Sequence, residues 1–227
     1  MTDRPVLAEP SPAVSAAPDT TPQPWQVTGS TISYQDRFLK VRTDQCLTPA
    51  GVVVPTYHVI EALDWVNVLA LTPQFEVVLA EEYRHGVGLV LAGIPGGSSE
   101  SGEDTDPAQA ARREFLEETG YGCSRLIQVS SSFISTGTMS SRTHSFLGLD
   151  AQCIGPQHLD PNEQVRVRRV PFLEWFRAAR ADAQHTQSTQ QVTHLQAMWG
   201  TVSVILSGQE PSLDPLRGPL IELLSSP

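Results

Sequence analysis

The sequence lacks features that would point to several protein classes. It has no apolar run of the ~18 residues that a membrane span requires, and its first residues lack the basic and apolar regions of a secretion signal. Its formal net charge of −10, from 15 Lys and Arg against 25 Asp and Glu, disfavours sequence-independent nucleic-acid binding. It has only three cysteines and no Cys-x-x-Cys pair of the kind found in zinc or redox sites. We therefore expect a cytoplasmic protein with reduced cysteines and neither a membrane nor a nucleic-acid partner.

The composition is that of a globular protein. The chain has 227 residues, of which 40% are apolar and 18% charged, enough to bury a core in one or two domains. Residues 1–24 hold six of the eighteen prolines and have little to bury, which predicts a disordered tail. We expect a β-rich N-terminal subdomain over residues 25–61, a main domain over 62–207 and a C-terminal tail over 208–227.

Short runs rich in Val, Ile, Thr and aromatic residues predict most of the secondary structure as strands. The predicted strands are 25–34, 38–46, 52–61, 65–71, 75–83, 89–94, 124–130, 143–149 and 164–170. Helices are expected at about 107–119, 171–181 and 189–206. This order of strands, helix, strands and helices favours an α+β fold with a sandwiched α/β/α plan.

The first predicted helix has well-marked ends. Asp106 fits the N-cap, Pro107 the first helical position and Gly120 the C-terminal stop. The helix follows a Gly- and Ser-rich segment, residues 95–104, which predicts a long loop. Long ordered loops are commonly functional.

Three carboxylates share one face of this helix. At 100° per residue, Glu118 lies about 40° to one side of Glu114, and Glu117 about 60° to the other. Like charges this close repel, and a divalent cation relieves the repulsion; oxygen ligands suit Mg²⁺ or Mn²⁺. The alternative is a solvated helix face, because charge runs are common on helices. The Gly-rich loop that feeds directly into the helix favours a metal and phosphate site.

The loop and the helix together resemble a known motif. Gly97, Glu103 and residues 113–121, Arg-Glu-Phe-Leu-Glu-Glu-Thr-Gly-Tyr, resemble the Nudix box of the Nudix hydrolases, and every defined residue of the box is present. The spacer over residues 104–112 has nine residues where the family usually has seven. The insertion lengthens the loop before the helix and leaves the metal-binding half of the box unchanged.

The resemblance extends over residues 25–207. Residues 81–84 and 94–97 are similar to segments of the ADP-ribose pyrophosphatase branch, and so is the β-rich start, which in that branch helps to build a homodimer. The resemblance implies a Nudix-type α/β/α sandwich with a mixed sheet and a small N-terminal β subdomain. Gly93 replaces a Glu of that branch and Thr136 a Pro, so the substrate stays open.

The resemblance also implies the site residues. It makes the Gly96 carbonyl a metal ligand and places a further carboxylate, Glu163, in a late acidic loop, with the choice of general base between Glu117 and Glu163 left open. Arg113 lies four residues before Glu117 and can pair with it. The predicted metal ligands are Gly96, Glu114, Glu117 and Glu118, the predicted catalytic residues Glu117, Glu163 and Arg113, and the predicted substrate-binding residues Arg84, Gly97 and Arg142.

Some of these side chains also have plainer interpretations. The planar fork of Arg84 suits a diphosphate, but a surface salt bridge with one of residues 81–82 is an equal alternative. Arg142 and His144 follow a Ser-, Thr- and Gly-rich loop, residues 130–141, that could overhang a pocket and touch substrate. For His144 an ordinary core or rim position is favoured.

We predict a metal-dependent hydrolase that cleaves the diphosphate linkage of a nucleoside diphosphate derivative, with ADP-ribose or a nucleotide sugar as substrate and Mg²⁺ or Mn²⁺ as cofactor. Trp25 and Trp65 could stack on an adenine, although a packing role is favoured. The alternative from another class is a catalytically idle Nudix domain that senses a nucleotide. Against it, all the box carboxylates are present, and residues 208–227 are too short for a helix-turn-helix domain.

Overall fold

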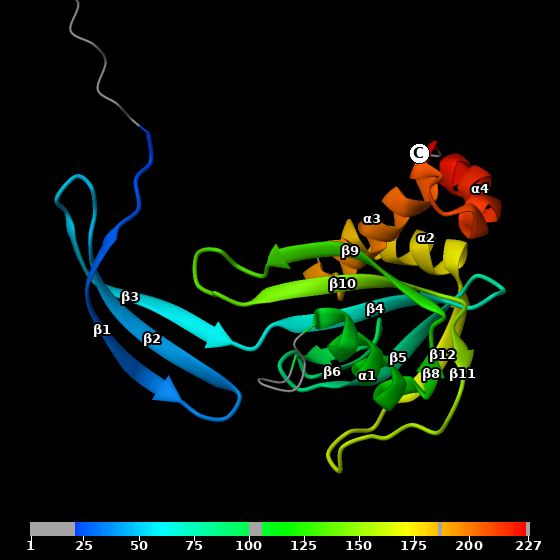
Figure 1. Cartoon of the computed structure of the whole chain (residues 1–227), viewed down its shortest axis with the longest axis horizontal. Helices are drawn as coiled ribbons and strands as arrows, with labels where there is room; N and C mark the ends of the chain where they lie inside the picture. Colours follow the sequence, from blue (N-terminus) through cyan, green and yellow to red (C-terminus); the bar gives the residue numbers. More distant parts are fainter. Residues whose placement is uncertain (1–20, 100–105, 186–187, 226–227) are drawn as a thin grey trace, which may run out of the picture.

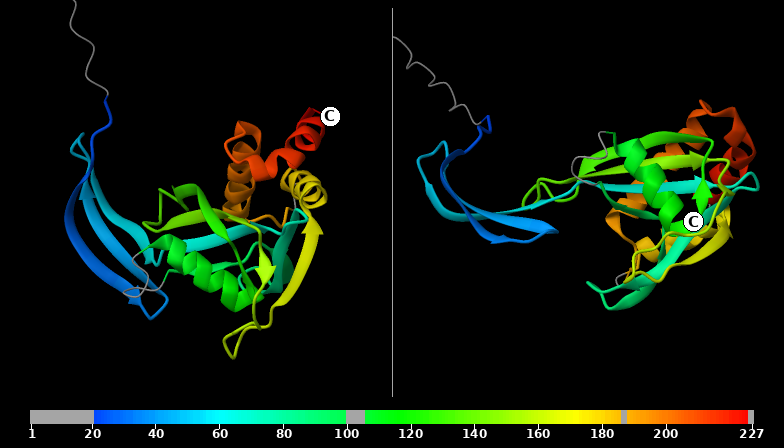
Figure 2. Two further views of the ribbon diagram at one scale, coloured as in Figure 1. Left: turned by 45° about the vertical axis from the view of Figure 1, so that its right-hand side comes forward. Right: turned by 60° about the horizontal axis from the view of Figure 1, so that its bottom comes forward.

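The computed structural model describes residues 21–99, 106–185 and 188–225. An antiparallel three-stranded sheet in the order β1-β2-β3 comes first and projects to one side of the main body (Figures 1 and 2). Its strands are β1 (Gln26–Gln35), β2 (Leu39–Leu47) and β3 (Val53–Ala62). The three strands predicted between residues 25 and 61 are confirmed.

The main sheet is mixed and has seven strands. Its order is β12-β5-β4-β10-β9, with β6 paired to β5 and β7 to β4. Only the β4–β10 pair is parallel among the described pairs of this sheet. The strands are β4 (Trp65–Leu71), β5 (Glu76–Arg84), β6 (Leu89–Gly93), β7 (Gly96–Ser98), β9 (Arg125–Phe133), β10 (Arg142–Leu149) and β12 (Arg166–Pro171); a small ribbon joins β8 (Tyr121–Gly122) to β11 (Gln152–Cys153).

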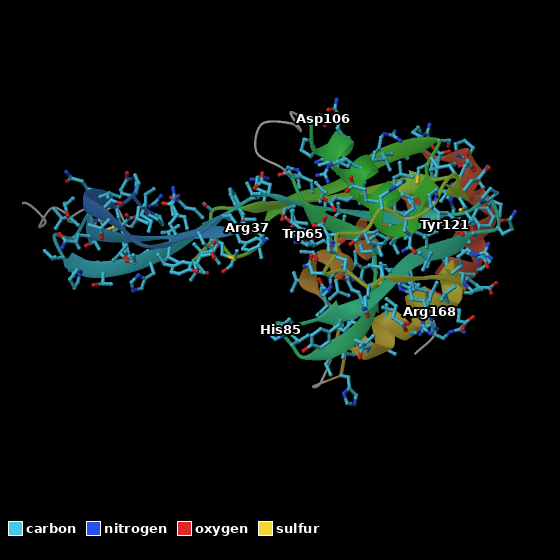
Figure 3. The ribbon with its side chains drawn as sticks, turned by 90° about the horizontal axis from the view of Figure 1, so that it is seen from below. Arg37, Trp65, His85, Asp106, Tyr121 and Arg168 are labelled. Atoms are coloured by element: carbon cyan, nitrogen blue, oxygen red, sulfur yellow. The ribbon has the colours of Figure 1, made fainter. Side chains whose placement is uncertain are left out.

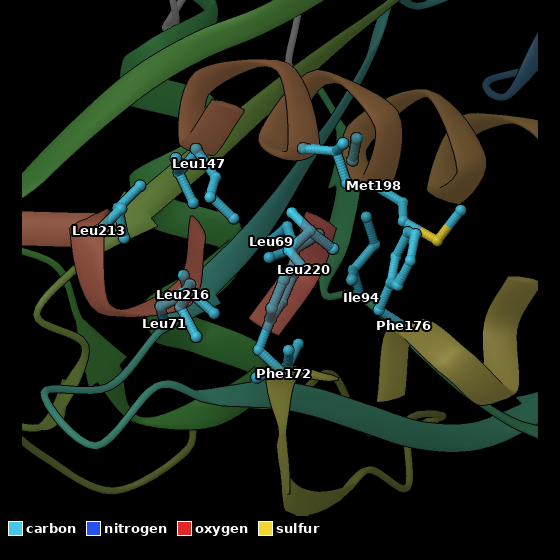
Figure 4. Packing of buried hydrophobic residues seen from close by; sticks show 14 of the residues in the cluster. Leu69, Leu71, Ile94, Leu147, Phe172, Phe176, Met198, Leu213, Leu216 and Leu220 are labelled. Carbon is cyan, nitrogen blue, oxygen red and sulfur yellow. The ribbon is translucent and has the colours of Figure 1, made fainter. Parts of the chain in front are cut away.

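Helices cover both faces of the main sheet. The central strand β4 sends Val66 and Val68 into a core beneath α1 (Pro107–Thr119), and Leu69 and Leu71 into the opposite core. That second core lies beneath α2 (Phe172–Ala183), α3 (Val192–Ser207) and α4 (Asp214–Ser225) (Figure 4). Because both faces of β4 are buried, its sequence is almost continuously apolar. The expected α+β class and α/β/α sandwich are confirmed.

The ends of α1 follow from local chemistry. Asp106 has an extended backbone, and its side chain accepts a hydrogen bond of 3.0 Å from the Ala108 N–H. Gly120 has φ 72°, a left-handed conformation that glycine adopts without a Cβ penalty. A Cβ on Gly120 would also lie 2.4 Å from the Gly155 carbonyl oxygen, so this position needs glycine for two reasons.

Five elements were not predicted: β7, η1 (Pro211–Leu213), α4 and the short strands β8 and β11. Residues 96–98 lie in a segment predicted as loop, but they form β7, which pairs with residues 65–67 of β4. Residues 208–227 were predicted to be a tail, yet η1 and α4 lie there, and α4 packs on α2 and α3. Leu216 and Leu220 of α4 are buried, so tertiary burial stabilises a helix that its internal proline disfavours.

The β9–β10 loop joins the N-terminal sheet to the main body. The Ile60 N–H of β3 donates to the Thr138 carbonyl at 2.7 Å, and the Tyr57 hydroxyl donates to the Gly137 carbonyl. The tip of the loop predicted to overhang a pocket therefore contacts β3. No helix in the described part of the chain is long and apolar enough to cross a membrane.

Candidate active site

Helix α1 carries three carboxylates beside β7 that differ in how far they are exposed to solvent. The Glu118 residue is 7% exposed, and its Oε2 accepts a hydrogen bond of 2.9 Å from the Gly96 N–H. The Glu114 side chain is 17% exposed, whereas that of Glu117 is 40% exposed. Glu114 and Glu118 therefore line the interior of the site, and Glu117 lies at its rim.

The two glycines of β7 allow close packing on both sides of this strand, Gly97 against helix α1 and Gly96 against strand β4. A Cβ on Gly97 would be 2.3 Å from Glu114 Oε2, and a Cβ on Gly96 would be 2.2 Å from the Val66 carbonyl oxygen. Neither position has room for a side chain, which is a recognised reason for glycine within a strand. The predicted site residues Gly96, Gly97, Glu114 and Glu118 are thus brought together.

Arg113 pairs with two of the carboxylates. Its Nη1 lies 2.9 Å from Glu114 Oε1 and 3.0 Å from Glu117 Oε2. The pairing with Glu117 predicted from the four-residue spacing is confirmed, and the pairing with Glu114 is additional. Arg113 therefore orients both side chains.

The surroundings of Glu114 and Glu118 disfavour the ionised form of both carboxyl groups. Burial raises the pKa of Glu114 to about 7 against the opposing effect of Arg113, and the charges of Glu117 and Glu163 add to the rise. Burial raises the pKa of Glu118 to about 8, where Glu82 and Glu114 add to the rise and the Gly96 N–H and Arg84 oppose it. A buried pair of carboxylates that resists ionisation is typical of a site that accepts a cation.

The sequence analysis did not include Glu82 among the site residues. Its side chain on β5 is 14% exposed, and Oε1 lies 2.6 Å from Arg84 Nη2. Burial raises the pKa of Glu82, Arg84 opposes the rise, and the charge of Glu163 adds to it. The sequence did contain a signal for Glu82, because this residue directly precedes Tyr83-Arg84 in the segment that resembles the pyrophosphatase branch.

The salt bridge considered for Arg84 is therefore present, but it is not a surface pair. The Arg84 side chain is 29% exposed and lines a hollow together with Trp65 and Leu91. Glu81 points elsewhere and pairs with Arg166 and Arg168 of β12. Arg84 thus has one acidic neighbour and still faces open space, where an anion could contact it.

The late loop between β11 and β12 is tied to the end of α1. The Gln157 side-chain amide donates to the Glu118 carbonyl and, at 3.2 Å, to the Val165 carbonyl. The His158 N–H donates to the Glu117 carbonyl at 2.9 Å. These bonds hold the loop beside the carboxylates, and Gln157 is a second residue that the sequence analysis did not identify.

Glu163 lies at the open end of this loop. Its side chain is exposed, and its Oε2 accepts a hydrogen bond of 3.0 Å from the Asp160 N–H. Its charge raises the pKa of both Glu82 and Glu114, which places it within electrostatic reach of the cluster. The structure thus brings a residue distant in sequence to the carboxylates of α1.

Arg142 and His144 lie apart from these contacts. The Arg142 guanidinium stacks on the Phe133 ring at 4.4 Å, and its Nη2 donates to the Ser131 carbonyl at 3.0 Å. His144 Nε2 lies 3.5 Å from Asp64 Oδ2. Both side chains therefore contact the sheet and its edge rather than the carboxylates.

The donor set fits a hard divalent cation in kind and charge. Carboxylate oxygens are the ligands that Mg²⁺ and Mn²⁺ prefer, and a bound cation would favour the ionised forms of Glu114 and Glu118, which burial disfavours. Over residues 21–99, 106–185 and 188–225, however, no group of three or more His, Cys, Asp or Glu side chains forms a ready-made metal site. Glu103 of the box lies outside the described residues.

The fold and the carboxylate-bearing helix define a Nudix domain. Residues 64–195 match the family model of the NUDIX domain, which spans more than half of the chain, so the protein belongs to the Nudix family. Residues 25–60 match a second model, the nucleoside diphosphate sugar hydrolase N-terminal domain.

Similar proteins agree with this assignment. The chain is 31% identical over 106 residues to the ADP-ribose pyrophosphatase of Bacillus subtilis (strain 168), a match that covers 46% of this chain and 56% of that protein. It is 30% identical over 114 residues to the methanol dehydrogenase activator of Bacillus methanolicus, covering 50% of this chain and 60% of that protein. The chain thus spans little more than half the length of either relative.

A solved structure titled as an ADP compounds hydrolase shares the fold. It superposes with a TM-score of 0.68 at 20% sequence identity, and the superposition covers 83% of this chain and 97% of that chain. The superposition thus includes most of the chain.

Proposed function

We propose that this protein is a Mg²⁺- or Mn²⁺-dependent hydrolase that cleaves the diphosphate linkage of a nucleoside diphosphate derivative, with ADP-ribose or a nucleotide sugar as substrate. One observation carries the proposal: Glu114 and Glu118 are held side by side, largely buried, at the edge of a Gly-rich strand, with pKa values raised to about 7 and 8. The match to an ADP-ribose pyrophosphatase and to a nucleoside diphosphate sugar hydrolase domain supports the substrate class.

Each group of residues has a role in this reaction. Glu114 and Glu118, with Glu117 and the Gly96 carbonyl, would hold the metal. When bound, the metal would neutralise phosphoryl oxygens and lower the pKa of a bound water. Arg84 would grip the diphosphate through its planar fork.

Further groups place these residues. Arg113 orients Glu114 and Glu117, and Gly97 leaves the space that Glu114 occupies. Gln157 holds the late loop at the end of α1. The proposed roles therefore depend on contacts between α1, β7 and the late loop.

For the general base we favour Glu163 over Glu117. Glu117 shares Arg113 with Glu114, so part of its hydrogen-bonding capacity is occupied. Glu163 is exposed, comes from a different element and still lies within electrostatic reach of Glu114. A base must reach a water beside the reacting phosphorus, and a side chain at the open end of the site is suited to this.

The proposal is tested by a hydrolysis screen. The purified protein is incubated with ADP-ribose and a panel of nucleotide sugars, with Mg²⁺, with Mn²⁺ or with chelator, and an added phosphatase releases phosphate from the monophosphate products but not from the intact diphosphates. We expect metal-dependent release from at least one substrate. A folded protein that releases nothing from any compound with either metal would instead support the idle nucleotide sensor.

We also propose a homodimer formed through the N-terminal sheet. Large apolar side chains are exposed there, among them Ile32, Tyr34 and Val53, each at least half exposed. An isolated three-stranded sheet has two faces to cover, and a second copy of the chain can cover one of them. The three free cysteines agree with a reducing compartment, and we propose the cytoplasm.

A further inference from the structure

A hollow of about 520 Å³ opens beside Arg84. It lies between the β5–β6 turn, the start of β4 at Trp65 and residues 188–191 before α3. Figure 3 shows Trp65 and His85 of its lining along the same edge of the main domain. Its volume is within the range of pockets that hold small molecules.

The lining of the hollow combines apolar residues, neutral polar residues and the basic residues Arg84 and His85. Trp65, Leu89 and Leu91 supply an aromatic and aliphatic wall, and residues 188–191, Ser-Thr-Gln-Gln, supply hydroxyls and amides. No described residue that lines the hollow is acidic. The hollow is therefore suited to a neutral group with flat apolar faces and a polar edge.

Arg84 connects this hollow to the carboxylates. Its guanidinium contacts Glu82 at 2.6 Å, and Arg84 lines both the hollow and a narrow annex that His194 of α3 also lines. A diphosphate held by Arg84 has two ends. If one end reaches Glu114 and Glu118, the group on the other end lies at the hollow.

A narrow annex next to the hollow contains a close contact between His194 and Gly93. A Cβ on Gly93 would lie 2.4 Å from His194 Cε1, so the imidazole occupies the space that a side chain at residue 93 would need. Arg84, Gln190 and Gln191 line both the annex and the hollow. The two glutamines and Arg84 therefore lie where the two spaces adjoin.

We infer that the hollow binds the nucleobase of the nucleoside diphosphate substrate, stacked against Trp65, with its polar edge toward the amides of Gln190 and Gln191. This inference rests on the proposed function. A planar heteroaromatic ring has two apolar faces that the indole and the leucines can contact, and a polar edge that suits the polar residues 188–191. Each glutamine amide offers both a donor and an acceptor to the edge of the ring.

The test compares ligands with and without a base. Isothermal titration in the presence of chelator measures the affinity of AMP, GMP, UMP and CMP, with ribose 5-phosphate as the probe that lacks a base. We expect Trp65→Ala to weaken the best nucleotide by at least about tenfold, since stacking on an aromatic side chain is worth ~1–3 kcal/mol per base. The affinity of ribose 5-phosphate should stay the same, and Trp65→Phe should retain nucleotide binding within about threefold.

Two further variants complete the design. Gln191→Ala should weaken the best nucleotide without affecting ribose 5-phosphate. Trp25→Ala is the matched control, because Trp25 is 48% exposed and packs edge-on against Tyr57 in the N-terminal sheet, away from the hollow. If Trp25→Ala weakens nucleotide binding and Trp65→Ala does not, the base binds at the N-terminal sheet and the inference is wrong. Equal losses for AMP and ribose 5-phosphate in Trp65→Ala would also overturn it.

The same variants separate this inference from the proposed function. In steady-state hydrolysis, Trp65→Ala should raise KM by at least about tenfold and leave kcat within about threefold, because base binding acts before the chemical step. A wild-type protein that binds nucleotides through Trp65 but hydrolyses nothing would contradict the proposed function alone. If the wild-type protein hydrolyses its substrate and Trp65→Ala has the same KM, the nucleobase site alone is contradicted.

Discussion

Gly97 and Glu114 lie so close that a β-carbon on residue 97 would stand 2.3 Å from Glu114 Oε2. Because Gly97 of β7 has no side chain, the Glu114 carboxylate of α1 can occupy this space. The two residues are 17 positions apart in the sequence, and the position of the carboxylate depends on the absence of a side chain at Gly97.

The first prediction concerns this contact. Gly97→Ala should lower the rate of hydrolysis by at least about 10²-fold and weaken Mg²⁺ binding, because Glu114 must move away from its present position. Hydrolysis rates over a Mg²⁺ titration measure both effects. Gly137→Ala is the control, since nothing lies within 4 Å of a Cβ at that glycine. Normal turnover and normal Mg²⁺ dependence in Gly97→Ala would show that the close contact has no functional role.

The second prediction concerns the buried carboxylates. Glu114→Gln and Glu118→Gln should each leave a folded protein whose activity is reduced by at least about 10³-fold, because each removes a charged ligand from the proposed metal site. Activity at saturating Mg²⁺ is the measurement, and circular dichroism checks the fold. Glu174→Gln, an exposed position in the first turn of α2, should have no effect. Near-normal turnover in both variants would contradict the metal site.

The third prediction concerns pH. The folded-state pKa of Glu118, about 8, lies above the ordinary 4.5, so the folded protein binds this proton more tightly than the unfolded chain does. In chelator, stability from this group is fully present below pH 4.5 and is lost as the pH rises through 8, by up to a few kcal/mol. Glu118→Gln should show a smaller loss of unfolding free energy between pH 5 and pH 9 than wild type in urea titrations.

Added metal gives the converse check on Glu118. A cation favours the ionised carboxylate, so Mg²⁺ should stabilise the wild-type protein more at pH 9 than at pH 5 and should have little effect on Glu118→Gln. The same titrations of Glu174→Gln should follow wild type. Identical pH profiles for wild type and Glu118→Gln in chelator would rule out this carboxyl as the source of the dependence.

The fourth prediction concerns the general base. Glu163→Gln should lower kcat by roughly 10²- to 10⁴-fold with metal affinity nearly unchanged, since a base acts mainly in the transition state. Glu117→Gln should show the opposite pattern, in which metal binding is weakened more than kcat. Single-turnover kinetics and metal titration distinguish them. If Glu163→Gln reacts at the normal rate, and Glu117→Gln binds metal normally but does not react, Glu117 is the base.

The fifth prediction concerns assembly. The protein should be a homodimer at tens of micromolar by light scattering, and Val53→Asp should shift it toward monomer, because residue 53 is 67% exposed on an edge of the N-terminal sheet. Ile221→Asp places the same charge on an exposed apolar position of α4 and should leave the dimer intact. A wild-type monomer at this concentration would count decisively against the dimer.

Much of the local structure could be predicted because its causes are local. Asp106, Pro107 and Gly120 mark the ends of α1 through their own side chains and backbone preferences. The longer strands of the N-terminal sheet and the main sheet follow from runs of β-branched and aromatic residues. The carboxylate face of α1 follows from helical spacing alone, which is why the Nudix box is visible in the sequence.

Other elements depend on neighbours that are distant in sequence. Residues 96–98 have the composition of a loop, and they become β7 only because the edge of β4 is open to pair with them. Helix α4 contains an internal proline and no strong helical pattern, but Leu216 and Leu220 are buried when it packs on α2 and α3. The intrinsic secondary-structure propensity of a segment does not include the effect of such tertiary burial.

The sequence by itself determined the family and the helix that carries Glu114 and Glu118, because these depend on spacing along one element. Only the tertiary structure decided that Glu82 joins these carboxylates, that Gln157 ties the late loop to α1, and that a hollow opens between β4, β5 and the segment before α3. Those features arise where side chains from separate elements meet. Their electrostatics and shape depend on distances that the chain acquires only on folding.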